Sequence, residues 1–324
     1  MTDSNQNDVK RRKVDLEDKE LYDLLNLDDE NVEGRKMLDA EAVIRVVRQK
    51  PWLATKEYTF STDGLIYFPL IKAIKLRAPI EVIYALCCPE AMDGTTQALL
   101  FAIRHLASFD AVKLLLEKQP KLVKEQDPYS GFTPLHYACM RAPLETVSLL
   151  LDEWPEAAKE QRSGCLPLHY ACRYATAEVV SLLLKIYPEA VRKKDMEGDT
   201  PLHAACYEER NLDLIVLLLD SYPETIQETN YDGNTPVDIA EERNAPEDIA
   251  KLLSYTSILF DDELQKETLE EIMSFFTEIQ WWRGIWLIFK RHPAATQTIN
   301  LDTGVKAHFL SAAGRFCKLT SMWE

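Results

Sequence analysis

The stretch Thr133-Pro134-Leu135-His136-Tyr137-Ala138-Cys139 decides the fold of this chain, because it recurs with few changes further along the sequence. Near-copies stand at Leu166-Pro-Leu-His-Tyr-Ala-Cys172 and Thr200-Pro-Leu-His-Ala-Ala-Cys206, and a weaker copy stands at Thr235-Pro-Val-Asp-Ile-Ala240. Successive prolines of these copies are 33, 34 and 35 residues apart. A constant period of this size predicts a stacked array of small helical units rather than one closed globule.

Each copy contains the signals that begin a helix. Threonine is a favourable N-cap because its hydroxyl accepts a hydrogen bond from the first helical turn, and proline fits the next position, where no N–H is needed. A glycine three residues before each proline allows the positive φ of a tight turn. Periodic apolar segments at 147–151, 180–184 and 215–219 predict a second helix. The predicted unit is a turn, a short helix, a loop and a second helix.

The recurring Thr-Pro-Leu-His-x-Ala phrase, with the turns before it such as Asp195-Met-Glu-Gly-Asp-Thr200, resembles the ankyrin-repeat family over residues 120–256. The resemblance implies an all-α solenoid of stacked helix-turn-helix units with short turn or hairpin tips, which binds other proteins. The chain is a divergent subtype of that family. Its second helices are followed by Pro-Glu-Ala, as at Pro155 and Pro188, where the family has Gly-Ala-Asp.

The prolines that end second helices extend the array beyond its best-matching part. They follow apolar helical segments at positions 51, 89, 120, 155, 188, 223 and 293. We therefore expect degenerate ankyrin-like repeats over 37–119, core repeats over 120–256 and degenerate helical repeats over 257–324. Asp302-Thr-Gly304 and residues 305–316 predict one further turn and first helix, so we expect the last repeat to be truncated at Glu324.

Composition restricts the compartment and the class of partner. The first 20 residues are polar and charged, unlike a signal peptide, and no apolar run approaches the roughly 20 residues of a membrane span. Cys139, Cys172 and Cys206 occupy a slot where the family buries a small residue, so we expect free thiols. Reduced cysteines place the protein in the cytoplasm, with the nucleus as a further possibility.

The net charge of −16 is unevenly distributed. Residues 15–33 and 261–280 are strongly acidic, whereas residues 281–318 are basic, a stretch that we interpret as a solvated face. Because attraction to phosphate dominates nucleic-acid binding, an acidic chain is a poor nucleic-acid binder. We expect protein partners that are basic or neutral, and neither a nucleic acid nor a membrane.

The sequence contains no convincing catalytic, cofactor or metal site. The spacing of His136 and Cys139, repeated in the next two copies, places both side chains on one helix face, but a closed zinc site needs four convergent ligands. We expect these histidines to hydrogen-bond the turn backbone instead. No phosphate-binding glycine loop and no catalytic triad can be assembled. The prediction is therefore no catalytic residue, no cofactor and no metal.

The N-terminal segment 1–36 has two interpretations. Lys10-Arg11-Arg12-Lys13 is either a nuclear import signal or part of an ordinary solvated tail. The acidic, leucine-containing stretch from Leu16 to Leu27 is either a flexible docking or activation segment or a capping helix. The capping helix would place Leu21, Leu24 and Leu25 on the first repeat.

Two tryptophans are candidates for a second contact surface. Aligning Pro293 with Pro188 places Trp282 and Trp286 at outward-facing slots one helical turn apart. An exposed tryptophan pair is typical of an interface anchor. The alternative is that residues after Glu324 cover the pair, or that the junction is packed differently.

The resemblance places the partner-binding surface on the turn tips and on the exposed, concave side of the first helices. Phe132 and Met140 are the apolar residues that the register leaves exposed there. The predicted contact residues are Tyr129, Ser130, Phe132, Met140, Arg141, Arg162, Ser163, Arg173, Tyr174, Met196, Glu197, Asp199, Tyr207, Glu208, Tyr231, Asp232 and Asn234.

These observations predict a non-enzymatic scaffold or adaptor that binds a partner through the concave ankyrin surface. One alternative is a nuclear regulator of transcription that uses the N-terminal segment, and another is the regulatory arm of a longer enzyme. A cheap test concerns Leu166, which stands where other copies have the N-cap threonine. The pattern predicts that Leu166→Thr stabilises the protein by about 1 kcal/mol.

Overall fold

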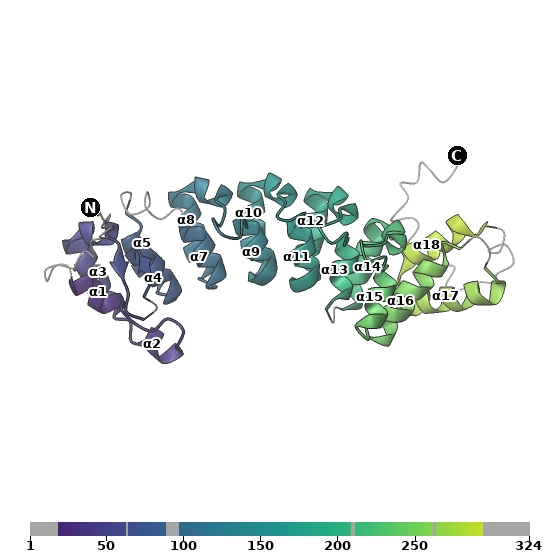
Figure 1. The fold of residues 1–324 in the computed structure, drawn as a ribbon, viewed down its shortest axis with the longest axis horizontal. Helices are drawn as coiled ribbons and strands as arrows, with labels where there is room; N and C mark the ends of the chain where they lie inside the picture. Colours follow the sequence, from purple (N-terminus) through teal and green to yellow (C-terminus); the bar gives the residue numbers. More distant parts are fainter. Residues whose placement is uncertain (1–18, 63, 89–96, 209–210, 262–263, 294–324) are drawn as a thin grey trace, which may run out of the picture. The chain divides into compact units, whose positions relative to one another are not determined.

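The computed structural model describes residues 19–62, 64–88, 97–208, 211–261 and 264–293, and within them the protein is helical apart from one short hairpin (Figure 1). The predicted nuclear import signal at Lys10–Lys13 and the predicted turn and helix at 302–316 lie outside the described residues. The chain divides into two compact units, Met1–Trp154 (unit 1) and Pro155–Glu324 (unit 2). Each unit is described by itself.

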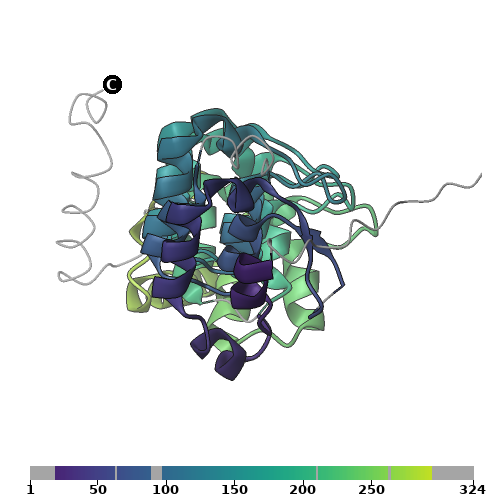
Figure 2. The same ribbon diagram turned by 90° about the vertical axis from the view of Figure 1, so that its left-hand side faces the viewer.

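Unit 1 begins with a helix whose leucines are buried. Leu21 and Leu25 are fully buried in the first helix, which packs on the third and fourth helices. The hairpin pairs Tyr58 with Tyr67 in antiparallel register, and in Figure 2 it stands to one side of the helices of unit 1. The elements of unit 1 are α1 (Lys19–Leu25), α2 (Val32–Lys36), α3 (Ala40–Gln49), η2 (Pro51–Thr55), β1 (Tyr58–Thr59), β2 (Ile66–Tyr67), α4 (Pro69–Lys75), α5 (Ile80–Leu86), α7 (Ala98–Arg104), α8 (Phe109–Lys118), η3 (Pro120–Lys124), α9 (Pro134–Arg141) and α10 (Leu144–Glu153).

Unit 2 continues the predicted alternation of short first helices and longer second helices, and its first helices lie side by side (Figure 1). Its last two helices differ, because the first of them is 13 residues long whereas the earlier first helices have six to eight. The elements of unit 2 are η4 (Pro155–Lys159), α11 (Pro167–Tyr174), α12 (Ala177–Ile186), η5 (Pro188–Arg192), α13 (Pro201–Cys206), α14 (Leu212–Ser221), η6 (Pro223–Gln227), α15 (Pro236–Glu242), α16 (Glu247–Ile258), α17 (Lys266–Glu278) and α18 (Trp282–Arg291).

The prolines after the second helices do more than end them. Proline drives the residue before it out of the helical region, and the caps Tyr187 and Tyr222 accordingly have extended φ angles of −135° and −159°. Within the described residues five of these prolines start a short 3-10 helix, namely Pro51, Pro120, Pro155, Pro188 and Pro223. Buried residues of these turns, such as Val191 and Ile226, contribute to the core.

The core of each unit lies between its first and second helices. Small side chains line the first helices, with Ala138, Ala171 and Ala205 fully buried, so that the helices pack closely. The second helices contribute larger ones, such as Val180 and Leu183 of α12. Burying each such side chain stabilises the fold by about 2 kcal/mol. The free thiols Cys139, Cys172 and Cys206 are buried in this layer, where they serve as small apolar groups.

Candidate interaction surface

A local network of Thr, Pro and His starts the first helices α9 and α13. In α13 the Thr200 hydroxyl accepts a hydrogen bond from the His203 backbone N–H, while the Thr200 N–H donates to His203 Nδ1 at 3.2 Å. Thr133 and His136 form the same reciprocal cap at the start of α9. This arrangement satisfies two backbone donors that a helix start would otherwise leave unpaired.

The histidines also connect neighbouring repeats within unit 2. His169 Nε2 donates to the backbone carbonyl of Lys193 at 3.1 Å, and His203 Nε2 donates to that of Asn234 at the same distance. In both rings Nδ1 accepts from the N-cap N–H, so neither nitrogen has a lone pair free for a metal ion. Burial lowers the pKa of both histidines below its ordinary value, which keeps the rings neutral. These histidines are therefore structural clamps.

Leu166 breaks the pattern because its side chain cannot accept a hydrogen bond. The Leu166 N–H still donates to His169 Nδ1 at 3.0 Å, but the leucine side chain is 0% exposed. Replacing it with threonine would gain a cap of about 1 kcal/mol and lose buried apolar surface that contributes about 2 kcal/mol. From the structure we therefore expect Leu166→Thr to destabilise the protein, whereas the sequence pattern predicts stabilisation.

The turns before α13 and α15 are shaped by an Asp or Asn at their start. Asp195 Oδ1 accepts from the N–H groups of Glu197 and Asp199 at 2.9 Å, and Asn230 Oδ1 plays the same part in the next turn. The two turns touch, because the Tyr231 N–H donates to the Glu197 carbonyl at 3.0 Å. Sequence reasoning identified the turn that begins at Asp195 but assigned no role to its carboxylate or to the Asn230 amide, although an Asx residue three positions before a glycine is a recognisable turn signal.

The predicted contact residues differ in exposure. Asp199 is only 2% exposed, and its carboxylate accepts from Asn230 Nδ2 at 2.9 Å, so its side chain supports the turn from within. Phe132 and Met140 are half-buried, not exposed as the register suggested, because Phe132 stacks on His136 and packs edge-on against Tyr137. Ser130, Tyr207 and Asn234 are also half-buried, and the exposed members are Tyr129, Arg141, Arg162, Ser163, Arg173, Tyr174, Met196, Glu197, Glu208, Tyr231 and Asp232.

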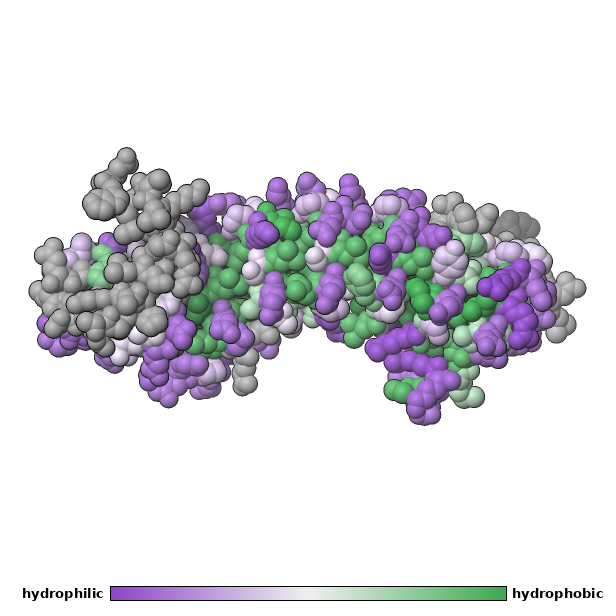
Figure 3. Space-filling model, turned by 180° about the vertical axis from the view of Figure 1, so that it is seen from behind, coloured by the Kyte–Doolittle hydropathy of each residue, from purple (hydrophilic) through white to green (hydrophobic). Residues whose placement is uncertain are grey.

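Two groups of these residues come together in unit 2. The Arg173 guanidinium lies 5.3 Å from the centre of the Tyr207 ring and 5.7 Å from that of Tyr174. The second group consists of Met196 and Tyr231, which protrude from the two touching turns and are 65% and 75% exposed. Sequence reasoning missed Arg243, whose guanidinium also lies near Tyr207, 5.2 Å from the centre of its ring. Figure 3 shows, on one face of the molecule, apolar side chains interspersed with polar ones.

The tryptophans near the start of α18 have different environments. Trp286 is 42% exposed with the Lys290 ammonium 5.3 Å from its ring centre, whereas Trp282 is half-buried. Trp281 is buried, and its indole N–H donates to Asp220 Oδ1 at 2.6 Å. Gly284 makes this possible, because a Cβ there would stand 2.2 Å from the Trp281 ring.

Comparison with known proteins agrees with the architecture. A profile of the family described as ankyrin repeats (3 copies) matches residues 99–192 and again residues 168–262, which together make up half of the chain. Among curated proteins none matches the chain. Within the part of the chain that the structure describes, no helix is both long and apolar enough to span a bilayer. The helical repeats, their capped first helices and this match show that the chain belongs to the ankyrin-repeat family.

Proposed function

We propose that this protein is a non-enzymatic interaction scaffold or adaptor, which binds a partner protein through its turn tips and first helices. Ankyrin repeats are in general protein-interaction modules. The observation that carries the proposal for this chain is the pair Met196 and Tyr231, which protrude from two neighbouring turns of unit 2. Large apolar side chains held in place by rigid turns are typical anchors of protein interfaces.

The charges around this pair indicate the chemistry of the partner at this site. Glu197 and Asp232, next to Met196 and Tyr231, are exposed acids, and the first helix α15 contributes Asp238, Glu241 and Glu242. An apolar partner surface with basic residues at its rim, or a neutral one, complements this combination. Unit 2 is therefore proposed to bind a basic or neutral protein.

The proposal can be tested by protein capture with matched variants. The full chain would be used as bait beside Met196→Ser/Tyr231→Ser and beside Tyr84→Ser, a control tyrosine of similar exposure on α5 of unit 1. Partner proteins should be captured by the wild type and by Tyr84→Ser but not by the double variant. Each captured partner, once purified, should also bind the purified wild-type protein directly. An unchanged set of captured proteins with the double variant would refute the proposed surface.

We also propose that the protein works in the cytoplasm, where thiols stay reduced. Cys139, Cys172 and Cys206 are free and buried, and burial raises the pKa of Cys206 to about 12. A fluorescent fusion of the full chain tests the compartment. Its accumulation in the nucleus, abolished by replacing Lys10–Lys13, would favour the nuclear alternative.

A further inference from the structure

The first helices α4, α7 and α9 of unit 1 carry basic residues and no acidic ones, unlike α1, which contains Glu20 and Asp23. α4 contains Lys72 and Lys75, α7 contains Arg104, and α9 ends at Arg141. In a chain with a net charge of −16, three first helices in a row therefore contain no acidic residue, although acidic second helices lie between them in the sequence. The second helices α5, α8 and α10 carry six acids, which are Glu81, Asp110, Glu117, Glu145, Asp152 and Glu153, and α8 also carries Lys113 and Lys118.

Aromatic rings connect these cations into one continuous strip. The Lys75 ammonium lies 4.6 Å from the centre of the Tyr67 ring, which meets Phe101 edge-on at 5.9 Å. The Arg104 guanidinium lies 6.0 Å from the Phe101 ring centre and 5.4 Å from that of Tyr137. We call Lys75, Tyr67, Phe101, Arg104 and Tyr137 the cationic strip. Its three rings are half-buried and Arg104 is 46% exposed, whereas the Lys75 side chain is only 11% exposed, so the strip is accessible chiefly at Arg104 and the rings.

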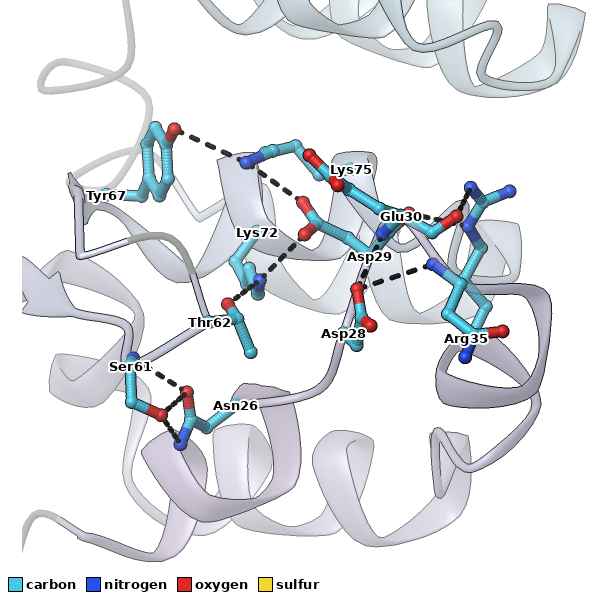
Figure 4. A network of polar contacts seen from close by, with 11 residues as sticks. Asn26, Asp28, Asp29, Glu30, Arg35, Ser61, Thr62, Tyr67, Lys72 and Lys75 are labelled. Atoms are coloured by element: carbon cyan, nitrogen blue, oxygen red, sulfur yellow. Dashed lines mark hydrogen bonds and ion pairs between the residues drawn. The ribbon is translucent and has the colours of Figure 1, made fainter.

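An acidic residue of the chain itself already binds at one end of the cationic strip (Figure 4). Asp29, in the loop between α1 and α2, lies between Lys75 at 2.9 Å and the fully buried Lys72 at 3.3 Å. Although burial acts to raise the pKa of Asp29, the hydrogen bond from Lys75 and the charges of both lysines lower it below its ordinary value. This contact shows how a carboxylate in an irregular segment binds the first helices.

The electrostatic environment beyond Asp29 remains positive. His105, at the end of α7, stacks on Phe101 and has its pKa lowered to about 4, first by burial and then by the charges of Lys75 and Arg104. Asp127 partly compensates Arg104, whose Nη1 lies 3.4 Å from Asp127 Oδ2. Arg141, further along the first helices, is exposed. Cations of the first helices thus extend over three repeats of unit 1, and Arg104 and Arg141 among them are exposed.

We infer that the cationic strip, continued by Arg141, is a docking surface for an extended acidic segment of a partner protein. Neighbouring helices are about 10 Å apart, and an extended chain covers that distance in about three residues. In the polyproline II conformation, which has three residues per turn and rises about 3.1 Å per residue, the segment would present an acidic side chain on the same face at every third position, and the residues between would contact the aromatic rings. The inference rests on the proposed role of the first helices in partner binding, and it assigns this chemistry to unit 1 alone.

The inference can be tested with synthetic peptides and the full chain. Fluorescein-labelled peptides of repeated Glu-Gly-Ser and Gln-Gly-Ser triplets would be titrated with the protein at low salt, and anisotropy recorded. We expect the Glu peptide to bind at least about tenfold more tightly than the Gln peptide, with an affinity that falls as salt rises. Arg104→Gln and Arg141→Gln should each weaken its binding about fivefold. Arg45→Gln, which removes an exposed arginine from α3, should change nothing.

Several outcomes would overturn the inference. The inference is wrong if the Glu peptide does not bind, or if it binds no more tightly than the Gln peptide. It is also wrong if Arg45→Gln weakens binding as much as Arg104→Gln does, or if a single-stranded oligothymidine binds more tightly than the Glu peptide. Circular dichroism of Arg104→Gln shows whether the variant is folded, and the exposed Arg141 gives an independent variant. If the peptides fail but capture still depends on Met196 and Tyr231, the proposed function stands and only the acidic partner is refuted.

Discussion

Gly198→Ala should weaken the contact between two neighbouring turns of unit 2, and Gly233→Ala supplies a matched control. Both glycines have positive φ, 80° and 87°. A Cβ at Gly198 would lie 2.7 Å from the Tyr231 backbone nitrogen and 2.9 Å from its ring, whereas a Cβ at Gly233 would meet nothing within 4 Å. Alanine at either position has the same unfavourable φ, so only the packing differs.

The expected free-energy changes follow from this geometry. Positive φ costs alanine about 1 kcal/mol, which is the whole effect expected at Gly233. At Gly198 the displaced turn also loses the 3.0 Å hydrogen bond from Tyr231 N–H to the Glu197 carbonyl. That loss costs about 1 kcal/mol, and overpacking adds about 1 kcal/mol more. We therefore expect destabilisation by about 3 kcal/mol at Gly198, against about 1 kcal/mol at Gly233.

Urea unfolding followed by circular dichroism measures both changes, provided that the dependence of free energy on urea concentration stays the same. Hydrogen exchange at the Tyr231 amide gives a local readout, and it should accelerate in Gly198→Ala but not in Gly233→Ala. Equal destabilisation by the two substitutions would refute the argument, because the close approach of the turns would then contribute nothing.

Three further changes test other parts of the fold. Asp29→Asn should destabilise unit 1 by about 3 kcal/mol, because it leaves a buried lysine without its counter-charge; thermal melting measures this, and an unchanged midpoint would contradict the buried pair. Leu166→Thr should lower the free energy of unfolding by about 1 kcal/mol, because the lost burial of the leucine outweighs the gained cap. Urea denaturation measures this, and a higher free energy of unfolding in the variant would contradict it. Stability should fall between pH 7 and pH 5.5, because the folded pKa values of His169 and His203 lie below the ordinary 6.5 and the unfolded chain takes up the protons. His203→Gln should reduce this pH dependence in urea titrations, and an unaltered slope would show that the ring protonates freely in the folded state.

The recurring phrase predicted the repeats correctly because its signals are local. Thr200 and Pro201 determine where α13 begins, and a proline such as Pro188 determines where α12 ends, within a few residues of sequence. The family profile and the helical structure confirm this fold class. Local signals of this kind do not depend on distant parts of the chain.

The surface was harder to predict because it depends on contacts between distant residues. The ion pair between Asp29 and Lys72 joins the N-terminal segment to a first helix, and no periodicity reveals it. The burial of Asp199 follows from its bond with Asn230 of the next repeat. Trp281 is the buried tryptophan because Asp220, 61 residues earlier, accepts its indole N–H. The sequence alone does not reveal this partner, and sequence reasoning named only Trp282 and Trp286 as contact candidates. Predicting such side chains requires the tertiary neighbours.

The buried thiols can serve as probes of local opening of the repeats. Cys139, Cys172 and Cys206 occupy equivalent places in three successive repeats, and each is covered in the closed repeat. Only the thiolate reacts with an alkylating agent, and burial raises the pKa of Cys139 and Cys206. All three thiols are covered, so alkylation requires that the repeat opens. The order in which the three cysteines are alkylated under native conditions would therefore reveal which repeat opens first, and a bound partner would delay the cysteine beneath it.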